Sequence, residues 1–423
     1  MEHSNSRRPI LVMLVIGVVI IATLSLVPNA LYRHSEVRQS AAAFVADNDA
    51  SSATSQPVAV SRAEFDAASW YASRGEEPEA HGVMIESLNH DRLFASHNAD
   101  QAFNPASLIK LATSLVALKR LGADYRFRTR VYVDGEVNAA GTLRGQLYVT
   151  GSDPTFGDIA AALISNELQR AHGIKRIDGQ INVSPDFSFN YSESAEDSAG
   201  RLAKALRLGN PRTGVAGEPT NGLLFTFGSY ELRDVLLYMN AHSSNFVSER
   251  IGALVGGAAG VQQFLIDDLK LPPDQVTIGR VSGREHNRMT PRGLLAVIRG
   301  LVEETKRQGL EPADIMPVAS DDSGTLRRRL MGTPLEGAVI AKTGTLTAEV
   351  DGGMASLAGI VYTEDAGMVL FAILDQGNHI WEHRQMEDQL LAEVLTTQTR
   401  PRAFGVPPQR KLLPSSALRI EKG

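Results

Sequence analysis

Residues 104–122, NPASLIKLATSLVALKRLG, constrain the fold of this chain more than any other segment. Leucines recur in it at helical spacing, at Leu108, Leu111, Leu115 and Leu118. The neighbouring positions are also apolar, so the pattern predicts a helix buried on most faces. Asn104 suits the cap, Pro105 the first helical position and Gly122 the end. Lys110 stands inside this apolar stretch, and its burial requires a reason.

The reason lies three residues earlier, at Ser107. Positions i and i+3 share a helix face, with Cβ atoms about 5–6 Å apart. Desolvation favours the neutral amine of a lysine, which can accept a proton from a serine hydroxyl. Ser-x-x-Lys alone is weak evidence, because a chain of this length contains roughly one by chance. A lysine whose amine reaches solvent remains an open alternative.

Two further triplets follow in the chain. Ser243-Ser244-Asn245 comes at the end of a helical pattern, and Lys342-Thr343-Gly344 lies on a predicted strand. Each has an ordinary structural interpretation, as a helix-ending turn and as a strand that ends near a glycine. A Lys-Thr-Gly triplet is nevertheless expected by chance only about one time in ten. All three motifs in this order are much rarer.

Together the motifs form the set found in penicillin-binding proteins and serine β-lactamases. The chain resembles the class C low-molecular-mass penicillin-binding proteins, the D-alanyl-D-alanine carboxypeptidase/endopeptidase family. The resemblance extends over about residues 80–395 and includes LYVTGSDPTF and SGTLRRRL. It implies an α+β fold, a penicillin-binding/serine β-lactamase-like antiparallel sheet flanked by helices, with a small α/β insertion domain.

The resemblance also implies roles in acyl transfer. Ser107 would attack the carbonyl between two D-alanines, and Lys110 would be its general base. Burial and repulsion from Lys342 would keep that amine neutral. Ser243 would relay the proton to the departing amine, and Asn245 would donate a hydrogen bond to the substrate or to Lys110.

The remaining site residues would bind the substrate. Lys342 and Thr343 would hold its terminal carboxylate, and Gly344 would leave room beside the strand. The edge of that strand would pair with an extended peptide. Backbone N–H groups of Ser107 and Thr345 would form the oxyanion hole.

Two features depart from the family pattern. Ser107 and Ser243 lie 136 positions apart, so the insertion is shorter than usual for the family. In GRVSGREHNRMTP, position 280 is Arg where the family loop often has Asp. Both affect the expected preference between carboxypeptidase and endopeptidase activity. His242, His286 and Asp153 are interpreted as structural residues.

Composition excludes several chemistries. The chain has no cysteine, which excludes thiolate catalysis, disulfides and cysteine-bound metals. A formal net charge of −6 gives no basic surface typical of nucleic-acid binding. The acyl-transfer chemistry requires no cofactor, so none is expected.

The N-terminus predicts export. Arg7 and Arg8 precede an apolar run over residues 10–27, nearly long enough to cross a bilayer. The run is long for a signal-peptide core, which favours an uncleaved inner-membrane anchor with a periplasmic enzyme; a cleaved signal peptide is the alternative.

The expected organisation has six parts. They are a signal anchor or signal peptide (1–33), a flexible linker (34–62), the first part of a transpeptidase-like domain (63–140), an insertion domain (141–222), the second part (223–398) and a basic tail (399–423).

The sequence therefore predicts a periplasmic serine-type D-alanyl-D-alanine carboxypeptidase, with endopeptidase activity as a further expectation. Its partners would be peptidoglycan stem peptides, β-lactams as acylating inhibitors and the inner membrane. Two alternatives stay open: a non-catalytic wall-binding scaffold, and a β-lactamase or esterase on the same fold.

Overall fold

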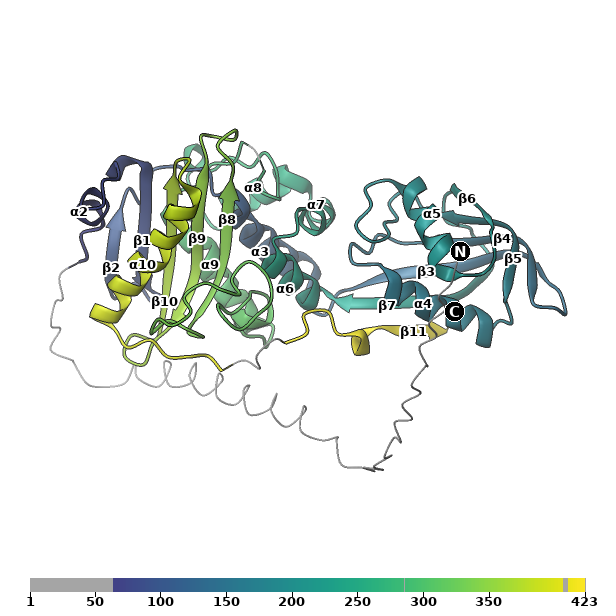
Figure 1. Ribbon diagram of the computed structural model, residues 1–423. Coiled ribbons are helices and arrows are strands. Elements are labelled where there is room, and N and C mark those ends of the chain that lie inside the picture. The colour runs from purple at the N-terminus through teal and green to yellow at the C-terminus, as the bar shows by residue number, and fades with distance from the viewer. Residues whose placement is uncertain (1–63, 285, 406–409, 423) are drawn as a thin grey trace, which may run out of the picture. The chain divides into compact units, whose positions relative to one another are not determined.

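The computed structural model describes residues 64–284, 286–405 and 410–422 (Figure 1). These residues belong to one unit of the chain, Ser55–Gly423. The predicted anchor and linker, residues 1–62, lie outside the described residues. Among the helices that are described, none is long and apolar enough to cross a membrane.

A five-stranded antiparallel sheet joins the two ends of the chain. Its strands, in spatial order, are β2 (Leu93–His97), β1 (His81–Ser87), β10 (Met368–Gln376), β9 (Met354–Tyr362) and β8 (Val339–Leu346). The contact between the early and late strands is the β1–β10 pair, in which His81 lies opposite Asp375. The predicted antiparallel sheet with strands from both ends is confirmed.

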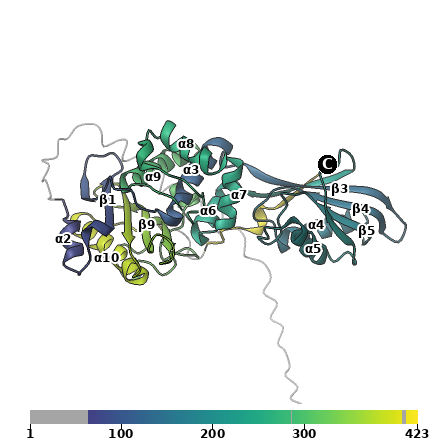
Figure 2. The same cartoon turned by 90° about the horizontal axis from the view of Figure 1, so that it is seen from above.

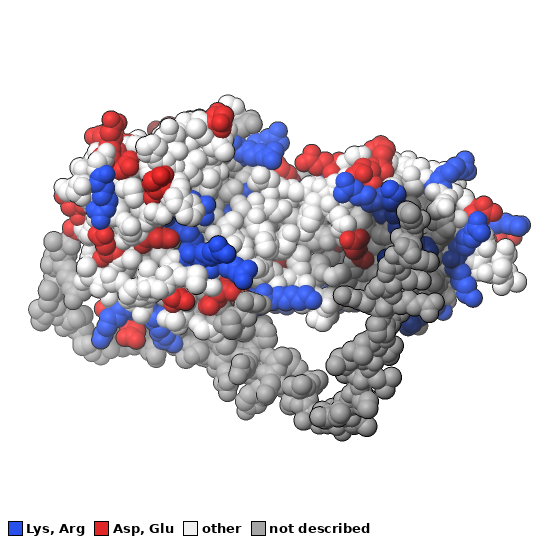
Figure 3. Space-filling view, in the orientation of Figure 1, with Lys and Arg blue, Asp and Glu red and all other residues white. Residues whose placement is uncertain are grey.

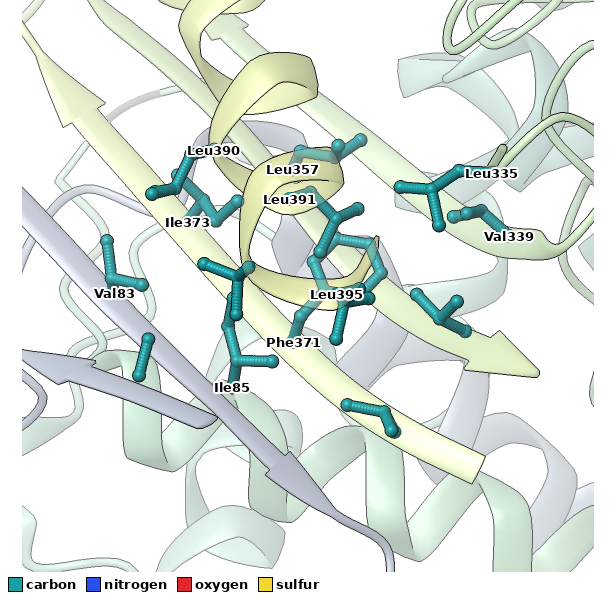
Figure 4. Close-up of a cluster of buried hydrophobic side chains, with 14 of the residues drawn as sticks. Val83, Ile85, Leu335, Val339, Leu357, Phe371, Ile373, Leu390, Leu391 and Leu395 are labelled. Atoms are coloured by element: carbon teal, nitrogen blue, oxygen red, sulfur yellow. The ribbon is translucent and has the colours of Figure 1, made fainter. Parts of the chain in front are cut away.

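Helices cover both faces of this sheet. Figure 2 shows α9 (Pro291–Arg307) and α10 (Ile380–Gln398) on opposite sides of the strands. Under α10, leucines pack on alternate residues of β1 and β10, such as Ile85 and Ile373 (Figure 4). The short helix α2 (Ala67–Ala72) adds Trp70 and Tyr71 to the same core. This apolar layer fixes the sheet on one side, since burial of apolar area is the main stabilising contribution.

On the face of the five-stranded sheet opposite α10, the central helix is α3 (Ile109–Leu121). Residues 109–118 are all buried, including Lys110, as the apolar pattern predicts. Around α3 pack α9 and three further helices, α6 (Leu232–His242), α7 (Asn245–Leu254) and α8 (Gly257–Asp267). Short 3-10 turns are η1 (Pro78–Ala80), η2 (Ala106–Leu108), η3 (Pro273–Gln275), η4 (Pro312–Asp314) and η5 (Ser415–Ala417).

A second sheet of six strands has its own core. Its spatial order is β11 (Arg419–Lys422), β7 (Leu223–Glu231), β3 (Arg126–Val137), β4 (Thr142–Thr150), β5 (Arg176–Val183) and β6 (Arg212–Val215). The helix α4 (Asp158–Arg170) connects the parallel strands β4 and β5, and the three elements form a βαβ unit, as in the α/β insertion that the resemblance implies. With α4, α5 (Ala195–Leu206) covers this sheet.

The six-stranded sheet extends beyond the segment 141–222 on both sides. It begins at Arg126, because β3 pairs with both β4 and β7, and β7 ends at Glu231. The segment 188–221, which is rich in Ser, Gly and Pro, contains α5, whose cap Ser194 accepts a hydrogen bond from the Asp197 backbone N–H. The expected boundaries at 140/141 and 222/223 fall within this six-stranded sheet, between β3 and β4 and at the start of β7.

The C-terminal tail is also part of this sheet. Residues 419–422 pair with β7, and Ile420 packs against the core of the second sheet. Four residues are too few for a clear strand pattern in the sequence.

Elsewhere on the surface, Figure 3 shows acidic and basic side chains intermingled on one face, in keeping with the modest net charge of −6.

Candidate active site

Ser107 lies in the turn before α3 rather than inside the helix. It belongs to η2, and α3 begins only at Ile109. Ala106 has a left-handed conformation (φ 49°), and its N–H donates to Asn104 Oδ1 at 3.0 Å. Asn104 thus holds this turn, but the predicted cap is wrong, because the N-cap of α3 is Leu108 and no side chain caps the helix. The helix begins four residues after Pro105, its predicted first position. The tight turn leaves Ser107 one turn from Lys110.

The amine of Lys110 makes three hydrogen bonds. Its Nζ donates to Ser107 Oγ at 2.9 Å, to Asn245 Oδ1 at 2.8 Å and to the Ser282 carbonyl. The side chain is fully buried. Asn245 accepts this bond, whereas the sequence analysis expected it to donate. The predicted pairing of Ser107 with a buried lysine is confirmed, and the solvent-reaching alternative is excluded.

Burial lowers the pKa of Lys110 from 10.5 to about 7. The nearby Glu249 carboxylate raises this pKa, and Arg284 lowers it. Lys342 was expected to lower the pKa of Lys110 by repulsion. Instead, repulsion from Lys110 helps to lower the pKa of Lys342. Near pH 7 a large fraction of Lys110 is a neutral amine, as a general base must be.

A tight connection between two helices positions the second motif. Ser243 ends α6 in the left-handed conformation (φ 53°, ψ 38°), and Ser244 caps α7 by accepting from the Val247 N–H. Asn245 is the first residue of α7. The left-handed residue reverses the chain, so that Ser243 reaches Lys342 and Asn245 reaches Lys110.

Lys342 of β8 closes the site. Its Nζ donates to Ser243 Oγ at 2.9 Å and to the Thr343 carbonyl at 2.6 Å. Burial, and then repulsion from Lys110, lower the pKa of Lys342 well below its ordinary value. An arriving carboxylate would favour the charged form again. β8 is an edge strand and Thr345 is exposed, as a strand that pairs with a peptide requires.

Gly344 is surrounded by protein. A Cβ there would lie 2.2 Å from Ser356 Oγ and 2.9 Å from the Pro105 carbonyl oxygen. The missing side chain therefore lets β8 and β9 approach the turn that carries Ser107, a reason that differs from the expected room for substrate.

The part that the backbone around Ser282 plays in the site was not predicted. The Ser282 carbonyl accepts from Lys110, and the Ser282 N–H donates to Glu249 Oε1 at 3.1 Å. Asn287 holds the loop, since its Oδ1 accepts from the N–H groups of Gly279 and Arg280. A carbonyl oxygen has no side-chain signature, so only the resemblance of this segment to a family loop could have indicated it.

Thr325 was also missed. Its Oγ1 accepts a hydrogen bond from Thr343 Oγ1 at 2.9 Å, and its N–H donates to the Ala241 carbonyl at 2.9 Å. It thus connects β8 to the end of α6. Of the residues interpreted as structural, Asp153 accepts from the Thr155 N–H at 2.8 Å, the expected Asx turn, and the His242 ring packs on Tyr238.

Three features together define one class of protein. They are an antiparallel sheet with helices on both faces, a serine paired with a buried lysine, and a second serine paired with a lysine on a strand. This class comprises the penicillin-binding proteins and serine β-lactamases.

The chain belongs to the D-Ala-D-Ala carboxypeptidase 3 (S13) family, which it matches over residues 68–199 and 186–398. A curated relative, the penicillin-sensitive carboxypeptidase A of Dictyostelium discoideum, is 31% identical over 146 residues. That alignment covers 31% of this chain and 27% of the relative. The chain therefore matches only about a quarter of the length of this relative.

Solved structures confirm the fold. Bd3459, a predatory peptidoglycan endopeptidase from Bdellovibrio bacteriovorus, matches with a TM-score of 0.69 and 19% identity, over 81% of this chain and 98% of that one. Penicillin-binding protein 4 (dacB) from Haemophilus influenzae matches with a TM-score of 0.60 and 18% identity, over 74% and 96%. The predicted fold class and family are confirmed.

Proposed function

We propose that this protein is a serine-type D-alanyl-D-alanine carboxypeptidase that acts on peptidoglycan stem peptides. The observation that carries the proposal is the 2.9 Å contact between Ser107 Oγ and the amine of Lys110, whose pKa burial lowers to about 7. Family membership supports the substrate class.

In the acylation step, Ser107 Oγ attacks the carbonyl carbon between the two D-alanines. Lys110 Nζ accepts the hydroxyl proton as the bond from oxygen to carbon forms. Backbone N–H groups of Ser107 and Thr345 would stabilise the tetrahedral oxyanion. The C–N bond then breaks, and the departing D-alanine amine takes a proton.

Ser243 would deliver that proton. Its Oγ lies 2.9 Å from Lys342 Nζ, so the hydroxyl can donate to the leaving amine while Lys342 returns a proton to Ser243. The proton that Lys110 took from Ser107 then restores Lys342, which leaves Lys110 neutral for the next step. Lys342, once charged, and Thr343 would hold the carboxylate of the last D-alanine. Water then hydrolyses the ester on Ser107, with Lys110 again as base. Groups of the chain and water balance every step.

A second candidate activity is DD-endopeptidase cleavage of cross-linked stem peptides. The β8 edge supports it, and so does the peptidoglycan endopeptidase named among the structural relatives. Penicillin-acylated Bd3459 supports β-lactams as ligands. Periplasmic location and tethering to the inner membrane rest on the sequence of residues 1–33 alone.

A peptide assay tests the proposal. A synthetic pentapeptide that ends in D-Ala-D-Ala should release one D-alanine, and the same peptide that ends in L-Ala should not. Ser107→Ala should abolish release, and a cross-linked dimer should show whether endopeptidase cleavage accompanies it. A folded wild-type protein that cleaves neither substrate would indicate the scaffold alternative; rapid repeated hydrolysis of penicillin would indicate a β-lactamase.

A further inference from the structure

Three metal-ligating side chains meet on the α10 face of the five-stranded sheet. They are Glu76 between α2 and η1, His81 at the start of β1 and His383 in the first turns of α10. One ligand atom from each lies within 4.8 Å of the others. His81 and His383 are buried, and Glu76 is partly exposed. Figures 1 and 2 show α2, β1 and α10 side by side.

The distances suit a tetrahedral ion. Glu76 Oε2 lies 3.6 Å from His81 Nε2 and 3.5 Å from His383 Nε2. Zinc bonds of about 2.0–2.1 Å to nitrogen and oxygen place neighbouring tetrahedral ligands about 3.3–3.4 Å apart. The two distances from Glu76 exceed this spacing by only a few tenths of an ångström, and the three ligand atoms all lie within 4.8 Å of one another. Hydrogen bonds at these lengths would be poor.

His81 is oriented as a metal ligand. Its Nδ1 lies 2.9 Å from Asp375 Oδ1, which also accepts from Tyr71 OH at 2.7 Å. A carboxylate on one ring nitrogen directs the other nitrogen at a metal. That other nitrogen, Nε2, is buried and has no hydrogen-bond partner. A buried polar atom without a partner is costly, and an ion would satisfy it.

We propose that Glu76, His81 and His383 bind a zinc ion, with Asp375 as the outer partner of His81. Two imidazoles and one carboxylate match zinc, whereas Mg²⁺ and Ca²⁺ prefer oxygen ligands. The carboxylates of Glu76 and Asp375 balance its charge. Because the side chain of Glu76 is 25% exposed, water can be the fourth ligand.

The ion would connect three separate segments. Residues 76, 81 and 383 come from opposite ends of the folded chain, and the ion would fasten the start of α10 to β1 and to the α2 loop. His81 lies on the same face of the sheet as Val83 and Ile85, which belong to the hydrophobic core under α10. Ala341 of β8 also belongs to this core, so the next residue, Lys342, points to the opposite face of the sheet. The ion therefore lies across the sheet from Ser107 and stabilises the fold rather than the reaction.

Cobalt provides the test, because tetrahedral Co²⁺ with two imidazoles absorbs strongly in the visible range. The full chain, treated with a chelator, should bind one Co²⁺ with this spectrum. One equivalent of Zn²⁺ should displace it and raise the melting temperature by several degrees. X-ray absorption of the zinc-loaded protein should show two imidazoles. No stoichiometric binding, or an octahedral all-oxygen spectrum, would overturn the proposal without any variant.

Variants assign the ligands. Glu76→Gln and His383→Gln should each weaken binding by more than about tenfold, since even outer partners of metal ligands contribute about 10–100-fold. The matched control is His379→Gln: His379 is exposed and occupies the N-cap position of the same helix, without a side-chain hydrogen bond to it. This variant should still bind one equivalent of the metal, with the same affinity as the wild type. Undiminished binding in both ligand variants, or equal loss in the control, would contradict the assignment.

Discussion

At the scale of single residues, the account depends on one amine. Lys110 is fully buried next to Ser107, and it is neutral only because burial lowers its pKa. The same desolvation that makes it a base also makes it a destabilising residue. Both consequences are measurable.

The first consequence is a pH-dependent rate. With the pKa of Lys110 at about 7, its neutral fraction rises about tenfold between pH 6 and pH 8 and then levels off. The rate of acylation by benzylpenicillin should follow this curve, which rapid-quench measurements across pH 5.5–9 can trace.

Glu249→Gln is the matched test of that assignment. The Glu249 carboxylate raises the pKa of Lys110, so its removal should move the midpoint to lower pH. The glutamine amide oxygen can still accept from the Ser282 N–H. A flat profile, or a midpoint that moves upwards, would show that another group limits the rate.

The second consequence concerns stability. A folded pKa of about 7 against 10.5 means that the unfolded chain binds more protons between these pH values, so wild-type stability rises with pH there. Lys110→Met should therefore be more stable than wild type at pH 6, on the order of 1–4 kcal/mol. The difference should shrink towards pH 10, as urea unfolding at both pH values would show. A methionine variant that is less stable at pH 6 would contradict the account.

At the scale of elements, close backbone approaches position the nucleophile. Gly283 (φ +87°) lies against the turn of Ser107: a Cβ would be 2.0 Å from the Ala106 carbonyl oxygen and 2.9 Å from the Ser107 nitrogen. The adjacent Ser282 carbonyl holds Lys110. A displacement of this loop must disturb both catalytic groups.

Gly283→Ala should thus lower the acylation rate more than tenfold, at a cost in stability of about 1–3 kcal/mol from the steric conflict. Gly75→Ala is the matched control, because Gly75 has a similar conformation (φ +82°) with nothing within 4 Å of a Cβ. The control should acylate at the wild-type rate. Equal loss in both variants would show that backbone strain, not the close approach, is responsible.

Elements with a strong pattern were predictable. The apolar periodicity of 108–118 predicts the buried α3, and the strand predicted at Lys342-Thr343-Gly344 is β8. The 3-10 turn at Ser107 was not predictable, because the hydrogen bond from the Ala106 N–H to Asn104 Oδ1 and the close approach of Gly283 impose it. Tertiary contacts decide such ends, not local propensity.

At the scale of the whole molecule, the site gathers segments that lie far apart in sequence. The three motifs could be recognised, and their residues meet as expected. The Ser282 carbonyl, Thr325 and the zinc ligands were not foreseen, because each acts through a backbone atom or a pairing that exists only after folding. The four-residue β11 was missed for the same reason: β7 gives it a partner.

The two sheets have separate hydrophobic cores. Truncation after Ala417 removes β11 and Ile420, which packs on the core of the six-stranded sheet. Calorimetry should show unfolding of that sheet at lower temperature, while acylation of Ser107 stays within about twofold of the full-length rate. A parallel loss of acylation would show that the two cores are coupled.

The most direct test of the central claim, that Ser107 is the nucleophile activated by buried Lys110, is intact mass spectrometry after incubation with benzylpenicillin. The account predicts one covalent penicilloyl group per wild-type chain and none on folded Ser107→Ala. An unmodified wild-type mass, or an adduct that persists in Ser107→Ala, would contradict it.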